Sequence, residues 1–153
     1  MADIEKLHFK IELAGTYWEK IPQYSVAINN DLIVPSGIIS TESDESFFVE
    51  FDYDADEEKD YEIQIRLENK TDLDVLKDDY ESEKFIILKD MLLHIRSIEI
   101  DDIELGFLML SHSEFIGDDP ERPTLHQCVD LGWNGTWKFM FKSPFYIWLL
   151  ENV

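Results

Sequence analysis

Three aspartates at alternate positions are the first residues here whose types and spacing could do chemistry. Asp52, Asp54 and Asp56, in "DYDADEEKD", carry carboxylate oxygens, which calcium prefers as ligands, and their spacing matches the start of an EF-hand loop. Glu57 stands where that loop needs its turn glycine, and Ile63 where it needs a bidentate glutamate, so an EF-hand is excluded. Two interpretations stay open: a turn that gathers these oxygens around calcium, and an exposed acidic turn that discourages pairing of sheet edges.

Aromatic side chains beside glycines are the second candidate site. Tyr17 and Trp18 lie in "AGTYWEKIP", and Trp133 lies in "LGWNGTW". Sugar rings present C–H faces that stack on aromatic rings, and Trp18 and Trp133 fall outside the strand alternation described below. We therefore expect Tyr17, Trp18 and Trp133 to bind a glycan; the alternative is ordinary packing in the core, which we expect for Trp137.

Nucleophilic chemistry has little support. Cys128 is the only cysteine, which excludes an intrachain disulfide, and its neighbour His126 has no third group to orient it. The other histidines lack metal-ligand spacing, and His8 and His94 fall at outward positions of expected strands. The acids are too numerous for any one pair to identify a glycosidase. The sequence therefore predicts a non-enzymatic protein. A glycan-active enzyme is the weakest of the alternatives, after the partner-binding function described below.

The elements that must position these residues are mostly strands. Apolar residues alternate with polar ones in "LHFKIEL" and "YEIQIRLE", which is typical of half-buried strands. "INNDL" predicts a hairpin, and "DADEEKD" predicts a second one. The one expected helix is the tail "SPFYIWLLENV", with Ser143 as cap and Pro144 at the first helical position. Strands are expected over 7–13, 24–29, 31–34, 47–53, 61–68, 85–88, 92–100 and 136–142.

These elements predict one domain, residues 1–153, with an all-β, antiparallel, jelly-roll-like β-sandwich fold and a short C-terminal helix. "LLHIRSIEIDDIEL" is interpreted as a long strand that bends at Asp101 and Asp102, because aspartate is tolerated at bends and bulges. The inward set should be Leu7, Phe9, Ile11, Leu13, Val49, Phe51, Ile63, Ile65, Leu67, Leu93 and Ile95.

Two segments carry a resemblance to a known family. "KDYEIQIRLENKTD" (59–72) followed by "LKDMLLHIRSIEIDDIELG" (88–106) resembles the late strands of jelly-roll carbohydrate-binding modules of the calcium-dependent, xylan-binding type. They also resemble small virion-associated proteins of tailed bacteriophages that have similar domains. The resemblance covers about residues 7–105 and leaves 107–153 as a C-terminal extension. It implies a jelly roll, a glycan ligand, calcium as the cofactor and a place in a virion.

The charge excludes some partners. Acidic residues number 34 and basic ones 13, a net charge of −21, which repels nucleic acid and anionic lipid. No apolar run is long enough to insert into a membrane, and "MADIEKLHFKIEL" lacks a signal-peptide core, so we expect a soluble protein made in the cytoplasm. Residues 42–83 hold 18 acids and four bases and should form an acidic face. The alternative function is accordingly a DNA mimic that occupies the basic cleft of a host protein.

The tail has more apolar surface than a short segment can hide. It can fold back over the sandwich with Phe145, Trp148 and Leu149 on one helical face, or it can pack on a second copy. Lys138 and Lys142 could meet acidic residues of a neighbouring copy, which favours a homo-oligomer.

Overall fold

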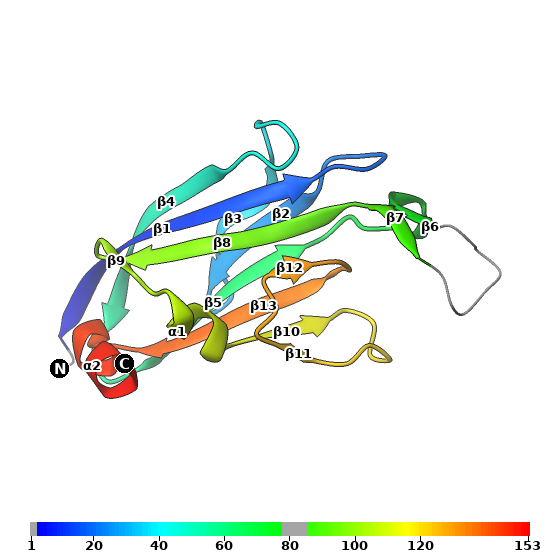
Figure 1. Cartoon of the computed structure of the whole chain (residues 1–153). Coiled ribbons are helices and arrows are strands. Elements are labelled where there is room, and N and C mark those ends of the chain that lie inside the picture. The colour runs from blue at the N-terminus through cyan, green and yellow to red at the C-terminus, as the bar shows by residue number, and fades with distance from the viewer. Residues whose placement is uncertain (1–2, 78–85) are drawn as a thin grey trace.

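The computed structural model describes residues 3–77 and 86–153 (Figure 1). Two antiparallel sheets pack face to face, so the predicted all-β sandwich is confirmed. No helix in these two ranges is long and apolar enough to cross a membrane.

One sheet is built around β1 and is called the β1 sheet. Its order is β12-β8-β1-β4, with β9 also paired to β8, and its strands are β1 (Ile4–Thr16), β4 (Phe47–Asp56), β8 (Leu92–Ile100), β9 (Ile103–Glu104) and β12 (Asp130–Leu131). The other, called the β13 sheet, has the order β11-β10-β13-β5-β2-β3. Its strands are β2 (Gln23–Ile28), β3 (Asp31–Ile38), β5 (Asp60–Leu67), β10 (Ser113–Gly117), β11 (Leu125–His126) and β13 (Gly135–Lys142).

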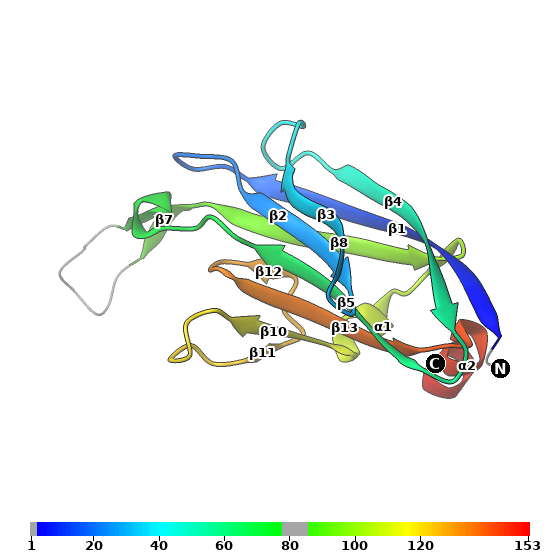
Figure 2. The same ribbon diagram turned by 180° about the vertical axis from the view of Figure 1, so that it is seen from behind.

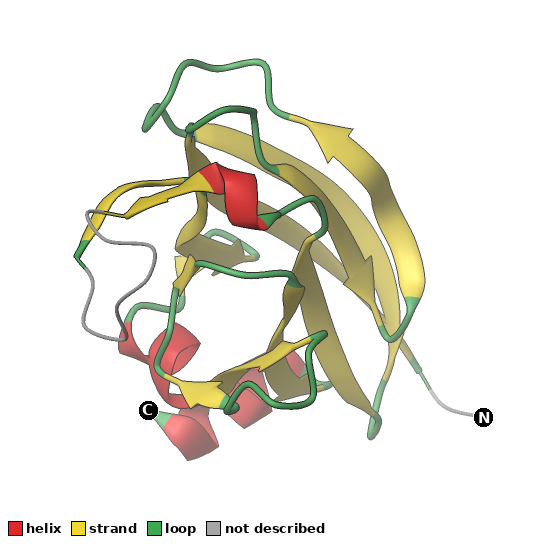
Figure 3. Cartoon of the chain, turned by 90° about the vertical axis from the view of Figure 1, so that its right-hand side faces the viewer, coloured by secondary structure: helices red, strands yellow, loops and turns green. Residues whose placement is uncertain are grey.

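The remaining elements are short. A two-stranded ribbon of β6 (Val75–Lys77) and β7 (Ile87–Asp90) projects from one end of the sandwich, after the turn η1 (Asp72–Asp74). The helix α1 (Phe107–Ser111) follows β9, and α2 (Phe145–Asn152) ends the chain. Viewed from the ribbon end, the two sheets curve around a shared interior (Figure 3).

Strand alternation builds the core as expected. All the predicted inward residues are buried except Phe51, which is half-buried and packs on the core, stacked on Phe9 with the ring centroids 5.0 Å apart. Trp137 is fully buried, as predicted, in a row with Phe139 and Phe141 on β13.

The topology is jelly-roll-like, because most connections carry the chain from one sheet of the sandwich to the other. The predicted β2–β3 hairpin is confirmed, with Asn29 and Asn30 in the left-handed region that such turns need. The predicted hairpin at "DADEEKD" is wrong. β4 pairs with β1, whereas β5 pairs with β13 and β2, so this turn carries the chain from one sheet to the other.

The bend predicted at Asp101 and Asp102 is a tight hairpin instead. Both residues have positive φ, 51° and 65°, and Ile100 pairs directly with Ile103. Aspartate suits such a two-residue turn because its short polar side chain tolerates the left-handed region. The Asp101 carboxylate accepts a hydrogen bond from the backbone N–H of His8 at 2.8 Å, which fixes the turn against β1.

The tail folds back on the sandwich, at the end where both termini lie (Figure 2). Phe145 is fully buried, and Trp148 and Leu149 pack on the core. Ser143 does not cap the helix; Glu5 of β1 does, accepting from the Phe145 N–H at 3.0 Å and from the Ser143 hydroxyl at 2.8 Å. A carboxylate at a helix N-terminus satisfies a free N–H and complements the helix dipole.

Candidate functional site

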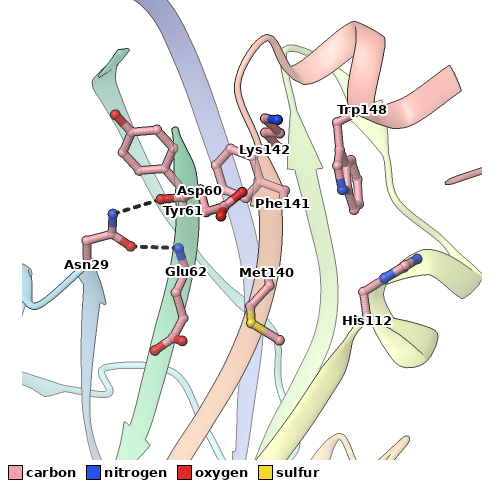
Figure 4. Close-up of a pocket in the computed structure, with 9 residues that line it drawn as sticks. All are labelled: Asn29, Asp60, Tyr61, Glu62, His112, Met140, Phe141, Lys142 and Trp148. Atoms are coloured by element: carbon pink, nitrogen blue, oxygen red, sulfur yellow. Dashed lines mark hydrogen bonds between the residues drawn. The ribbon is translucent and has the colours of Figure 1, made fainter. Parts of the chain in front are cut away.

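The outer face of the β13 sheet is hollowed into a trough. Two hollows of about 530 and 270 Å³ lie along it. The larger is lined by Asn29, Asp60, Tyr61, Glu62, His112, Met140, Phe141, Lys142 and Trp148 (Figure 4), and the smaller by Ser25, Ala27, Asn30, Leu32, Gln64, Arg66, Thr136 and Lys138. We call this surface, running from Arg66 to Trp148, the trough.

Small side chains on β2 create the smaller hollow. The strand alternation sends Tyr24, Val26 and Ile28 into the core, which leaves Ser25 and Ala27 on the outer face. These two short side chains lie beside the longer Arg66 and Gln64 of β5, so the surface over β2 is lower than the surface over β5 and forms a hollow.

Polar residues of both signs line the floor. The pairing of β5 with β13 puts Asp60 opposite Lys142 and Glu62 opposite Met140. Glu62 Oε1 accepts from Gln64 Nε2 at 2.7 Å and lies 3.6 Å from the Lys138 ammonium, so it joins the two hollows. The floor therefore offers hydrogen-bond donors and acceptors at close intervals.

The guanidinium of Arg66 lies at one end of the trough and is held in place by its hydrogen bonds. Arg66 holds Asp118 with two hydrogen bonds, of 2.7 and 3.1 Å, and also donates to Thr136 Oγ1 at 2.6 Å. The hydrogen bond to Asp118 raises the pKa of Arg66, so this cation stays charged and oriented.

Aromatic and apolar groups close the other end (Figure 4). Trp148 of α2 meets His112 edge to face, with ring centroids 5.3 Å apart, and packs in the same way on buried Phe139 at 5.9 Å. Met140 is 50% exposed on the trough floor. The Asn29 amide accepts from the Glu62 N–H at 2.8 Å and donates to the Asp60 carbonyl at 3.2 Å, which holds the β2–β3 turn at the rim.

Tyr17 and Trp18 lie elsewhere, in the loop after β1. The Tyr17 hydroxyl donates to the Thr41 carbonyl, its N–H donates to Ser43 Oγ at 3.0 Å, and burial raises its pKa. Trp18 is half-buried against the core. Tyr17 therefore fastens a neighbouring loop.

Trp133 lies in a third place, on a separate hollow of about 380 Å³. Its ring stacks on Phe115 with centroids 5.8 Å apart, and the Arg122 guanidinium lies 4.2 Å from the ring centroid. The three predicted aromatic residues thus do not line one shared hollow, and none of them lines the trough.

The three aspartates lie on the outer face of the extended strand β4, at the end of the β1 sheet. Asp52, Asp54 and Asp56 belong to β4, where alternate residues stand roughly 7 Å apart, so they do not converge as a calcium turn would require. Asp52 bonds the His8 imidazole at 2.7 Å, which raises the pKa of His8, and Asp56 bonds Lys59 at 3.0 Å. Within residues 3–77 and 86–153 no group of three or more His, Cys, Asp or Glu is arranged to hold a metal ion.

The acidic face expected over residues 42–83 is divided. β4 displays its acids on the β1 sheet and β5 on the β13 sheet, so the described part of this stretch faces two sides of the sandwich. On β1, Lys6 and Lys10 stand opposite Asp54 and Glu50. Residues 78–83 lie outside the described ranges.

Comparison with known proteins finds no matching family model, no matching curated protein and no matching solved structure. The resemblance to xylan-binding modules, and the virion setting that it implies, stay predictions. The residues that sequence reasoning missed are those of the trough. One signal was present in the sequence, since Met140 lies between Lys138 and Lys142 at the outward positions of a predicted strand. The hollow itself depends on the pairing of β2, β5 and β13, which the sequence does not show.

Proposed function

We propose that this protein is a binding module that takes a short glycan chain along the trough. The observation that supports this is a strip of hydrogen-bonding side chains on one sheet face that ends at an indole ring. Sugar hydroxyls both donate and accept, which matches the mixture of carboxylates, ammonium groups and amides on β5 and β13. The C–H faces of a sugar ring would pack against Trp148 and Met140.

Binding at the trough is non-enzymatic in this proposal. Glycosidases place two carboxyl groups on either side of the scissile bond. Asp60 and Glu62 instead stand side by side on one strand, and Glu62 is engaged by Gln64 and Lys138. A glycan would therefore be held without cleavage.

Met140→Arg tests the trough directly. Because this side chain is exposed, the change should cost the fold little, while the longer group puts a cation into the larger hollow, where the C–H face of a sugar would pack. On a glycan array that includes xylo-oligosaccharides, and then by calorimetry with the best ligand, we expect at least a tenfold loss of affinity, about 1.4 kcal/mol.

Ile38→Arg is the matched control, because Ile38 is 84% exposed on the edge strand β3 and lines neither hollow. It should bind like the wild type. Equal binding by both variants would contradict the trough as the site. Binding that weakens steeply with salt and ignores Met140→Arg would favour the acidic partner-binding alternative.

A further inference from the structure

A chain of hydrogen bonds on the outer face of the β1 sheet has the geometry of a catalytic triad. His94 Nδ1 lies 2.7 Å from Asp130 Oδ1, and His94 Nε2 lies 2.7 Å from Thr16 Oγ1. A hydroxyl, an imidazole and a carboxylate in this order are the nucleophile, base and orienting group of acyl-transfer enzymes.

Strand pairing fixes the three residues in place. β8 lies between β1 and β12, with Asp130 directly paired to His94 and Thr16 to Leu92. The His94 side chain is only 17% exposed, so its ring has little freedom to turn away. Side chains on neighbouring strands are more precisely held than side chains on loops.

A hollow of about 580 Å³ opens beside this chain. Thr16, His94 and Asp130 line it together with Arg96 and the apolar residues Ile95, Met109, Leu110 and Val129. An apolar pocket with a few convergent polar groups is the usual form of a small-molecule site. It lies on the opposite side of the sandwich from the trough.

We propose that Thr16, His94 and Asp130 form an acyl-hydrolase site for small carboxylic esters. Thr16 Oγ attacks the ester carbonyl carbon while its proton passes to His94 Nε2, and Asp130 holds the imidazole through Nδ1–H. The intermediate collapses, the C–O bond to the alcohol breaks, and the alcohol leaves with the proton from Nε2. Water then gives a proton to Nε2 and cleaves the acyl-threonine, which releases the carboxylic acid and restores the Thr16 hydroxyl.

The loop of residues 43–46 holds this site in a resting state. Asp44 Oδ1 also contacts the Thr16 hydroxyl, whose single hydrogen can serve only one acceptor at a time. The same loop occupies the cation of the hollow, because Arg96 donates to Ser46 Oγ at 2.6 Å and to the Asp44 carbonyl at 3.0 Å. Withdrawal of the loop would free the nucleophile for His94 and leave Arg96 to stabilise the oxyanion.

A fluorophosphonate probe tests the site, because an activated hydroxyl displaces fluoride and keeps the phosphonyl group. Mass spectrometry of peptides should find the adduct on Thr16, and Thr16→Val should abolish it. Removal of the base in His94→Asn should slow labelling at least about 100-fold. Asp44→Gly should speed it, and glycine suits the φ of 67° at this position.

Thr124→Val is the matched control, because Thr124 is exposed just before β11 of the other sheet and lines neither this hollow nor the trough. It should label like the wild type. The proposal is overturned if neither the wild type nor Asp44→Gly is labelled at Thr16 while circular dichroism shows both folded. Labelling confined to another residue would overturn it equally.

Discussion

At the scale of single residues, the most buried carboxylate in the described ranges holds its own turn together and ties it to Lys20. The Asp74 side chain is 2% exposed, and its Oδ2 meets Lys20 Nζ at 3.0 Å, the Thr71 N–H at 2.7 Å and the Thr71 hydroxyl at 2.9 Å. Burial alone would raise the pKa of this carboxyl, but the hydrogen bonds from Thr71 and Lys20 outweigh it, so the folded pKa is lowered.

A lowered folded pKa means that Asp74 stabilises the fold at pH values above its ordinary pKa of 3.8, and that this contribution is lost as pH falls through the folded pKa. Asp74→Asn should therefore cost about 2 kcal/mol at neutral pH, and the difference from wild type should shrink in strong acid. Urea unfolding across pH measures both. Asp54→Asn, an exposed carboxylate on β4, should change little. An equal deficit at every pH would contradict this reading.

The residue scale also shows why the core was predictable and the site was not. Leu7 to Leu13 were placed correctly because alternation along a strand is a local property. Trp133 looked like a free stacking ring, yet Phe115 and Arg122 pack on it, and both contacts depend on how β10 and the loop after it fold against the ring. Trp148 was assigned to a helix face correctly, but its place at the trough depends on where that helix docks.

At the scale of elements, α2 depends on a residue near the other end of the chain. Glu5 takes the role that the sequence assigned to Ser143, because the fold brings β1 to the helix N-terminus. Glu5→Gln keeps an acceptor but removes the charge, so we expect a loss of about 0.5–1 kcal/mol. Glu104→Gln is the control, because Glu104 is exposed on β9. Thermal melts of the two should differ, and equal Tm values would refute the cap.

Turns show the same limit of local information. Aspartates at 101 and 102 suit both a bend and a tight hairpin, and only the pairing of Ile100 with Ile103 decides between them. The turn after β4 was likewise predicted as a hairpin because its length and polarity allow one. Its flanking strands have different partners, which no local pattern reveals.

At the scale of the whole molecule, that single turn decides how charge is distributed. Because β4 and β5 belong to different sheets, the acids of residues 42–68 cannot gather on one face. On β1, Lys6 and Lys10 stand opposite Asp54 and Glu50 of β4. The sequence showed the excess of charge but could not show this division. On the β13 sheet the result is a trough lined by residues of both signs, such as Glu62 and Lys138. On the β1 sheet the result is that acids of β4 contact basic residues of β1, as Glu50 contacts His8.

The same scale sets the expectation for self-association. The largest aromatic groups of the tail are used within the chain, since Phe145 is buried and Trp148 packs on it with ring centroids 6.1 Å apart. Phe145→Ala should therefore cost about 3–5 kcal/mol and lower Tm strongly, whether or not copies associate. Ile147 and Leu150 remain 55% and 80% exposed on α2, and they are the most exposed aliphatic side chains of this helix that a second copy could cover. If a homo-oligomer forms through the tail, replacing both residues with Lys should give a folded monomer in sedimentation experiments. The Tm of this variant should equal the Tm of the wild-type protein at concentrations where it is monomeric. An oligomer that survives this change would show that another surface holds the copies together.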